Sequence, residues 1–216
     1  MSTNKYMRFT NIKWVFFDVG GVLLDDAEAE YRRTKLLLDV CVKYSQSLDT
    51  ENILDARRIA SSKTGSIEEN VIKYLLQDQI SQQAAQEEFK KRKKEIGYDQ
   101  HSTIRPDALA VAEQLSKKYK LGIMANQPMH RTKQLEEHGL TRYFHHSGMS
   151  DSYGFHKPDP RLFEEVFQET GADPTQSIMV DDNVERGLVP AKRLGMKTVW
   201  YIRENRNGAD PSVDIS

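Results

Sequence analysis

Residues 13–25 read KWVFFDVGGVLLD, and this stretch decides the fold. A run of apolar, β-favouring residues ends at Asp18, and Gly20 and Gly21 follow. So short an apolar run is typical of a strand buried on both faces of a parallel sheet. Asp18 would then lie at the carboxyl end of the strand, where open α/β sheets bind ligands, and the glycines would let backbone N–H groups approach an anion. The stretch indicates a carboxylate nucleophile beside a phosphate, although such an Asp could instead cap the turn.

The second half of the chain alternates between helical and strand patterns. Asp159 before Pro160 is typical of a helix start, with Asp as the N-cap and Pro in the first turn. Alternation of this kind predicts a doubly wound parallel sheet of the α/β class, with helices on both faces. The expected helices are 107–119, 131–138, one from 159 onward and 189–194, and the expected strands are 121–125, 145–149, 177–180 and 197–201.

Residues from about 26 to 100 show helical spacing throughout. Leu36, Leu37 and Val40 recur at the spacing of one helix face, and Ser66 followed by Glu69 has the pattern of a capping box. Because this block falls between the first strand and the others, we interpret it as an all-helical insertion. The expected division is a core of residues 1–25 and 104–216 with a helical domain of residues 26–103.

Composition excludes several classes of function. The 216 residues include 31 basic and 32 acidic side chains, and a formal net charge of -1 predicts no general attraction to nucleic acid or to a membrane. The basic run at 90–94 is interpreted as a solvated helix face. No apolar run approaches the roughly 20 residues that cross a bilayer, and no signal-peptide core follows Met1, so a cytoplasmic location is expected. The single cysteine, Cys41, excludes an internal disulfide and is expected in the core. The sequence does not indicate an oligomeric state.

Chemically active side chains follow four strand ends. Asp18 ends the first strand, Asn126 follows the second, Lys157 precedes Pro158, and Asp181 and Asp182 end a later strand. Acidic groups at neighbouring strand ends would repel one another unless a cation lay between them, and oxygen ligands suit Mg²⁺. A lysine nearby could hold a phosphate and offset the charge of the nucleophile.

In this ordered set the chain resembles the haloacid dehalogenase-like superfamily. Asp18 matches its first motif, Asn126 the second, Lys157 in Lys-Pro-Asp-Pro the third, and Asp182 in Val-Asp-Asp-Asn the fourth. The resemblance covers residues from about 12 to 202 and implies a Rossmann-like core, with the helical insertion as a cap domain. The phrase FDVGGVL resembles the branch that contains sugar-phosphate phosphatases and the amino-terminal domain of soluble epoxide hydrolases.

The resemblance implies a Mg²⁺-dependent phosphatase for small phosphorylated metabolites. Asp18 would attack phosphorus to give an aspartyl-phosphate that water hydrolyses, and Lys157 would steady Asp18 and the phosphoryl group. The implied metal ligands are Asp18, the Gly20 carbonyl and Asp182. The residues expected to bind the substrate are Gly20, Gly21, Asn126, Gln127 and Lys157, with backbone donors near Asn126 holding phosphate.

Three positions depart from the family pattern. Gly20 stands where the phosphatases usually carry a general acid, Ala125 where they carry a phosphate-binding hydroxyl, and Gly187 where a further carboxylate is expected. Loss of the acid alone would cost about 10²–10⁴-fold in rate. Asp25 is the nearest candidate substitute, because it opens the crossover into the insertion, although it could instead cap the first inserted helix.

Two alternatives follow from these departures. One is a family member that binds phosphate or a partner protein but turns over slowly or not at all, which the missing acid and hydroxyl favour. The other is a 2-haloacid dehalogenase, which uses an aspartate nucleophile without the second Asp or a metal. The pair Asp181 and Asp182 opposes the dehalogenase, since it would leave two carboxylates uncompensated beside Asp18.

Overall fold

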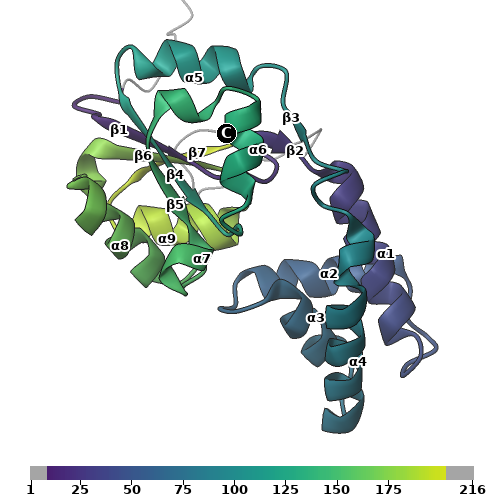
Figure 1. The fold of residues 1–216 in the computed structure, drawn as a ribbon. Coiled ribbons are helices and arrows are strands. Elements are labelled where there is room, and N and C mark those ends of the chain that lie inside the picture. Colours follow the sequence, from purple (N-terminus) through teal and green to yellow (C-terminus); the bar gives the residue numbers. More distant parts are fainter. Residues whose placement is uncertain (1–8, 203–216) are drawn as a thin grey trace, which may run out of the picture.

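A computed structural model describes residues 9–202, so residues 1–8 and 203–216 of the predicted core lie outside the described part. Its centre is a parallel five-stranded sheet in the order β5-β4-β1-β6-β7 (Figure 1). The strands are β1 (Trp14–Phe17), β4 (Lys120–Ala125), β5 (Phe144–Met149), β6 (Ser177–Asp181) and β7 (Lys197–Trp200). The first strand of the chain is therefore the middle strand of the sheet.

Helices cover both faces of this sheet because the side chains of β1 alternate between two cores. Val15 and Phe17 pack in the cluster that contains side chains of α5 and α6, whereas Trp14 and Phe16 pack in the cluster that contains side chains of α8 and α9. The helices concerned are α5 (Ala108–Ser116), α6 (Arg131–Glu137), α8 (Pro160–Thr170) and α9 (Val189–Arg193). The predicted doubly wound α/β class is confirmed.

Several shorter elements connect these strands and helices. Helix α7 (Ser150–Tyr153) follows β5, and 3₁₀ turns occupy Thr141–Tyr143 and Pro174–Gln176. A π-helical turn, Val184–Leu188, follows β6, which the sequence pattern did not predict. Turns of this type are rare and are found mainly at functional sites.

A helical lobe, residues 27–96, has a hydrophobic core of its own. It consists of α1 (Ala27–Cys41), α2 (Thr50–Ser61), α3 (Ile67–Leu75), α4 (Gln79–Arg92) and a 3₁₀ turn, Lys93–Ile96. Leu37, Ile53 and Ile72 are fully buried in this core. Cys41 also lies there as predicted, and burial raises the pKa of its thiol to about 11.

Two predicted helix starts are confirmed by their hydrogen bonds. The Ser66 hydroxyl accepts the N–H of Glu69 at the start of α3 and also donates to the carboxylate of Glu68. The Asp159 carboxylate accepts the N–H of Arg161 at the start of α8. Both bonds satisfy N–H groups that a helix leaves without internal partners.

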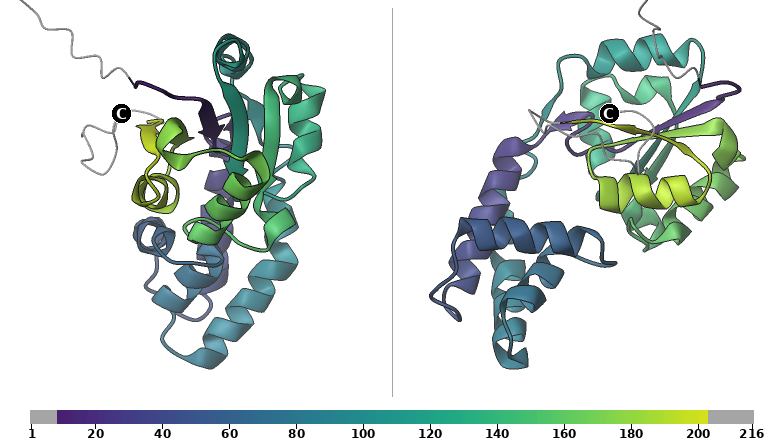
Figure 2. Two further views of the ribbon diagram at one scale, coloured as in Figure 1. Left: turned by 90° about the vertical axis from the view of Figure 1, so that its left-hand side faces the viewer. Right: turned by 180° about the vertical axis from the view of Figure 1, so that it is seen from behind.

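The chain enters and leaves the helical lobe through one antiparallel pair of strands. Strand β2 (Leu24–Asp25) pairs with β3 (Thr103–Ile104), and the Arg105 N–H donates to the Leu23 carbonyl. Figure 2 shows the lobe as a separate body joined to the core at this pair. Strands of two residues are too short to produce a sequence pattern. The predicted boundaries after residues 25 and 103 fall at this pair, and they stay a prediction.

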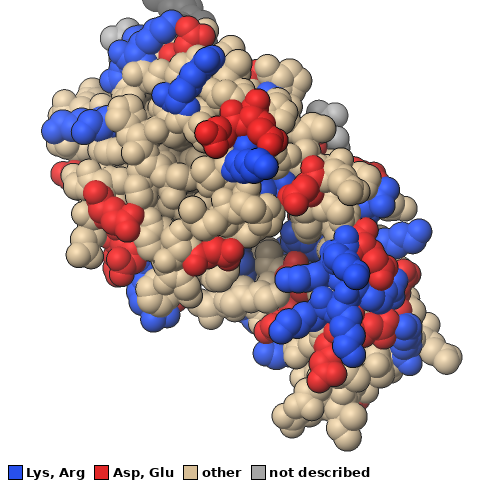
Figure 3. Space-filling view, viewed as in Figure 1, with Lys and Arg blue, Asp and Glu red and all other residues tan. Residues whose placement is uncertain are grey.

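Charged side chains of both signs are interspersed over the helical lobe in the view of Figure 3. Among the described residues, none of the helices has the length and apolar content that spanning a membrane would need.

Candidate active site

Asp18 lies at the carboxyl end of the central strand. Its N–H donates to the Val180 carbonyl over 2.9 Å, which continues the pairing of β1 with β6 by one residue. Its side chain is 12% exposed, so the carboxylate is largely screened from water but still reachable. The sequence placed Asp18 at this edge of the sheet, and the structure agrees.

The turn after Asp18 is held by its own backbone. The N–H groups of Leu23 and Leu24 both donate to the Val19 carbonyl, and the Gly21 N–H donates to Leu24 over 2.8 Å. Gly21 has φ of +76°, a conformation that favours glycine. Because its N–H already serves the turn, Gly21 is a weaker candidate for phosphate binding than the sequence suggested.

Asn126 fixes the loop that carries Lys157. Its side-chain oxygen accepts the Lys157 N–H over 2.7 Å, and its amide nitrogen donates to the Lys157 carbonyl over 2.9 Å. The side-chain amide of Asn126 therefore forms hydrogen bonds with both backbone groups of Lys157, as a neighbouring β-strand would. A phosphate contact from Asn126 would have to use its backbone N–H, in keeping with the backbone donors expected there.

Lys157 reaches from this loop to two carboxylates. Its Nζ donates to Asp18 Oδ1 over 2.7 Å and to Asp181 Oδ2 over 2.6 Å, and its side chain is 3% exposed. Burial alone would lower the pKa of Lys157, but the charges of Asp18 and Asp181 outweigh it and raise this pKa. The ammonium is thus held charged between the two acids, and it fixes the orientation of the candidate nucleophile.

Asp181 belongs to the site, although the sequence analysis gave a role only to its neighbour Asp182. It is the last residue of β6, is 1% exposed, and accepts the Asn183 N–H as well as the bond from Lys157. Burial raises the pKa of Asp181 to about 6, with Lys157 opposing the shift and Asp18 adding to it. Its position at a strand end was the signal, as it was for Asp18.

The Asp181 carboxylate also explains why position 187 carries no side chain. A Cβ on Gly187 would lie 2.0 Å from Asp181 Oδ2 and 2.2 Å from its Cγ, so no side chain fits there while Asp181 keeps its place. Gly187 lies in the π-helical turn that follows β6. The carboxylate missing from position 187 is thus replaced in space by the carboxylate of Asp181.

The acidic residues of the site could hold a divalent cation. One carboxylate oxygen each from Asp18, Asp181 and Asp182 lies within 4.8 Å of the others. Lys157 supplies a single positive charge against these three carboxylates, and hard oxygen ligands are those that Mg²⁺ takes. The donor set therefore fits a magnesium ion, with the Gly20 carbonyl as the remaining ligand expected from the sequence.

Asp25 lies at the start of α1. Its side chain is exposed, and Oδ1 accepts the Ala27 N–H over 3.1 Å at the start of α1. This is the helix-start role that the sequence left open as its alternative. The next residue, Asp26, is instead buried, and its carboxylate lies against Gly20.

The helical lobe is tied to the active-site end of the sheet by Arg186. Its guanidinium donates to the carbonyls of Ser61, Lys63 and Gly65, in the loop between α2 and α3. Asn183, which also binds Asp181, donates to the Ser61 hydroxyl over 3.5 Å. The loop of residues 61–65, counted from the last residue of α2, therefore lies beside the acidic cluster.

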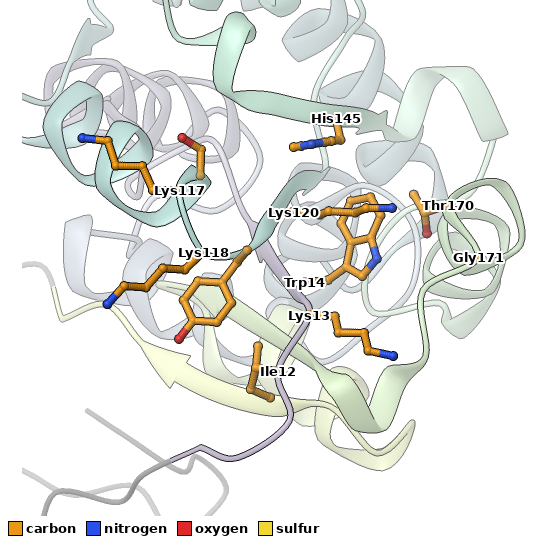
Figure 4. A pocket seen from close by; sticks show the side chains of 11 residues that line it. Ile12, Lys13, Trp14, Lys117, Lys118, Lys120, His145, Thr170 and Gly171 are labelled. Carbon is orange, nitrogen blue, oxygen red and sulfur yellow. The ribbon is translucent and has the colours of Figure 1, made fainter.

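A pocket of about 500 Å³ lies elsewhere on the core (Figure 4). It is lined by Trp14, the first residue of β1, and Lys120, the first residue of β4, with the Lys120 ammonium over the Trp14 ring. Asp18 lies at the opposite, carboxyl end of β1. We therefore do not include this pocket in the active site, because the catalytic groups are at the other edge of the sheet.

A family model described as haloacid dehalogenase-like hydrolase matches residues 12–195. This range runs from just before β1 to the second residue after α9, so it includes every side chain of the acidic cluster as well as the helical lobe.

Two relatives that match the chain are named as phosphatases. The glyceraldehyde 3-phosphate phosphatase of Pyrococcus abyssi is 31% identical over 84 residues, which are 38% of this chain and 35% of that protein. The enzyme of the same name from Methanothermobacter thermautotrophicus is 25% identical over 225 residues, covering 95% of this chain and 97% of that protein. The chain thus spans about a third of the length of the first relative and nearly all of the second.

A solved structure has the same fold. A haloacid dehalogenase-like hydrolase from Bacteroides fragilis superposes with a TM-score of 0.65 at 18% identity, covering 88% of this chain and 87% of that one. The likeness concerns the arrangement of the sheet and its helices, including the inserted lobe.

Gly187→Ala should disrupt the acidic cluster. The new methyl group would displace Asp181 or the π-helical turn, at a cost of about 1–3 kcal/mol in unfolding free energy. Thermal unfolding measures this cost. Gly187 lies outside the left-handed region, so its substitution tests crowding alone, whereas the comparison variant Gly154→Ala tests backbone strain alone, because Gly154 has φ of +71° and no atom within 4 Å of its Cβ position. A Gly187→Ala protein as stable as wild type would show that Asp181 does not occupy this space.

Asp181→Asn should stabilise the metal-free protein. The change leaves Lys157 paired with Asp18 alone. It also removes the buried carboxylate of Asp181, which repels the carboxylate of Asp18. Because Asp181 binds its proton more tightly in the folded state, wild type carries no penalty below about pH 4 and loses stability as pH rises through about 6.

The melting temperature of Asp181→Asn in chelator should therefore exceed that of wild type at pH 7, by about 2–4 °C per kcal/mol, and match it near pH 4. An advantage of equal size at both pH values would contradict the raised pKa of Asp181.

Proposed function

Because the chain belongs to the haloacid dehalogenase-like hydrolases, we propose that it is a phosphatase acting on a small phosphorylated metabolite. The observation that carries this proposal is the placement of the Asp18 carboxylate at the end of β1, oriented by Lys157 and beside two more carboxylates. A nucleophile, a cation to balance it and a set of metal ligands are what transfer of a phosphoryl group to an aspartate requires.

The reaction begins with attack of an Asp18 oxygen on phosphorus. The bond from phosphorus to the leaving oxygen breaks, and the phosphoryl group is left on Asp18 as an acyl phosphate, which water then hydrolyses. Lys157 stays charged through these steps, since its pKa is raised, and its ammonium stabilises the negative charge spread over the phosphoryl oxygens.

Asp18, Asp182 and the Gly20 carbonyl are the expected ligands of Mg²⁺, and the position of Asp181 makes it a further candidate. A bound Mg²⁺ would neutralise phosphoryl charge and relieve the repulsion among the carboxylates. Carboxylate oxygens of three residues lie close enough to share one cation, which supports a metal-dependent phosphatase over a metal-independent dehalogenase.

The loop of residues 61–65 supports a role of the helical lobe in substrate choice. Arg186 and Asn183 hold it beside the acidic cluster. The substrates in the names of the relatives are small phosphorylated compounds, and a substrate of that size would contact this loop while its phosphate lay at Asp18. The expected cytoplasmic location, and the absence of nucleic-acid and membrane partners, stay predictions.

A second candidate is a family member that binds phosphate with little turnover. The observation that favours it is the lack of a hydroxyl at Ala125, which is fully buried at the end of β4, together with the lack of a side chain at Gly20. Binding of inorganic phosphate without turnover of any phosphate ester would favour this candidate.

Asp18→Asn should abolish phosphatase activity while the protein stays folded. An amide is a poor nucleophile, so turnover of p-nitrophenyl phosphate should fall by about 10³-fold or more. Thermal unfolding of the variant checks the fold, and Asp173→Asn, at an exposed turn far along the chain, serves as the matched control. Near wild-type turnover by Asp18→Asn would contradict the assignment.

Turnover of phosphate esters should require Mg²⁺ and stop in chelator. Asp182→Asn should raise the Mg²⁺ concentration that gives half-maximal rate, because one carboxylate ligand is lost. The same preparation should be assayed with 2-chloropropionate, since dechlorination in chelator would replace the phosphatase by a dehalogenase.

A further inference from the structure

The space beside Gly20 is filled by another residue. A Cβ on Gly20 would lie 2.9 Å from Asp26 Oδ2 and 3.1 Å from Gln127 Nε2. The backbone of Gly20 is outside the left-handed region, so the conformation itself would accept a side chain. What blocks position 20 is the carboxylate of Asp26.

The direction of the Asp26 side chain is not explained by helix capping. Asp26 occupies the N-cap position of α1, but its carboxylate accepts none of the N–H groups of that helix. By contrast, Asp49, Asp78 and Asp159 each accept an N–H of the helix that they precede. At α1 the neighbouring Asp25 accepts the Ala27 N–H, which leaves Asp26 to turn inward. Asp26 is 6% exposed.

This inward direction brings Asp26 to the catalytic edge of the sheet. Gly20 lies two residues after Asp18, and Gln127 lies two residues after the end of β4. A carboxylate that borders both residues lies above the carboxyl ends of β1 and β4, which are neighbouring strands. Asp26 is therefore on the same edge of the sheet as the nucleophile.

From this placement we propose that Asp26 is the general acid and base of the reaction. The inference rests on the proposed phosphatase function. It assigns to Asp26 the task that the sequence analysis considered for Asp25, and it explains how the chain can work with glycine at position 20.

The proton transfers balance over the two steps. In the first, an Asp18 oxygen bonds to phosphorus, the bond from phosphorus to the leaving oxygen breaks, and the Asp26 carboxyl gives its proton to that oxygen, which departs as an alcohol. In the second, the Asp26 carboxylate takes a proton from water as the water oxygen attacks phosphorus. The bond from phosphorus to Asp18 then breaks, inorganic phosphate leaves, and Asp26 is again protonated.

The test compares leaving groups of similar size. Phenyl phosphate and p-nitrophenyl phosphate share a shape, but phenolate is the poorer leaving group and gains more from a proton donor. In the presence of Mg²⁺, Asp26→Asn should lower kcat for phenyl phosphate at least about tenfold more than kcat for p-nitrophenyl phosphate. Asn has nearly the same size as Asp, and the Asp26 side chain does not cap α1, so the fold should persist, and thermal unfolding checks it.

A relocated carboxylate gives the second test. In the double variant Gly20→Asp with Asp26→Gly, the blocking side chain is gone, Gly is tolerated at the N-cap, and the remaining neighbour is the flexible end of Gln127. The double variant should hydrolyse phenyl phosphate at least about tenfold faster than Asp26→Asn does. The single variant Gly20→Asp should recover nothing, since Asp26 still occupies the space.

The outcomes separate this inference from the proposed function. Equal effects of Asp26→Asn on both substrates, or a leaving-group effect in Asp25→Asn in its place, would overturn the role of Asp26 and leave the phosphatase standing. If wild type hydrolyses neither substrate at any Mg²⁺ concentration, the phosphatase proposal fails and the role of Asp26 fails with it.

Discussion

The buried ammonium of Lys157 is the contact on which the site depends. It joins the end of β1 to the end of β6 through Asp18 and Asp181, two residues that are far apart in the chain. An ammonium buried without partners would lose its proton, and two carboxylates buried without it would repel each other. Asn126 holds the backbone of the lysine on both sides, so the third strand end of the site, that of β4, sets the position of this charge.

Two departures from the family pattern have one structural account. Gly20 and Gly187 stand where acidic side chains were expected, and in each case a carboxylate six residues away in the chain fills the space. Asp26 lies against Gly20, and Asp181 lies against Gly187. The acidic character of the catalytic edge is therefore retained while the residues that supply it have changed. A comparison of motif positions alone would count these as losses of chemistry.

How much the sequence could predict varied with the length of the pattern. The apolar run before Asp18 identified the central strand, and the strand ends brought Asp18, Asn126, Lys157 and the Asp181–Asp182 pair together. The two-residue strands β2 and β3 and the five-residue π-helical turn were missed, because they show no periodicity. The sequence also could not show which of two adjacent carboxylates points into the site, because the direction of a side chain at the end of a strand or helix depends on tertiary contacts. Asp26 was therefore overlooked beside Asp25, and Asp181, although placed at the site, was given no ligand role beside Asp182.

The β2–β3 pair has a consequence for how such a protein can change. Asp25 lies opposite Thr103, so the inserted segment begins and ends at a single point of the core. The sheet is complete without the segment, since its five strands pair only with one another. A different helical segment with equally close ends could stand in its place while Asp18, Lys157, Asp181 and Asp182 kept their positions, provided that the new segment began with a carboxylate in the place of Asp26. The part of the molecule that meets the substrate is thus physically separable from the part that cleaves it.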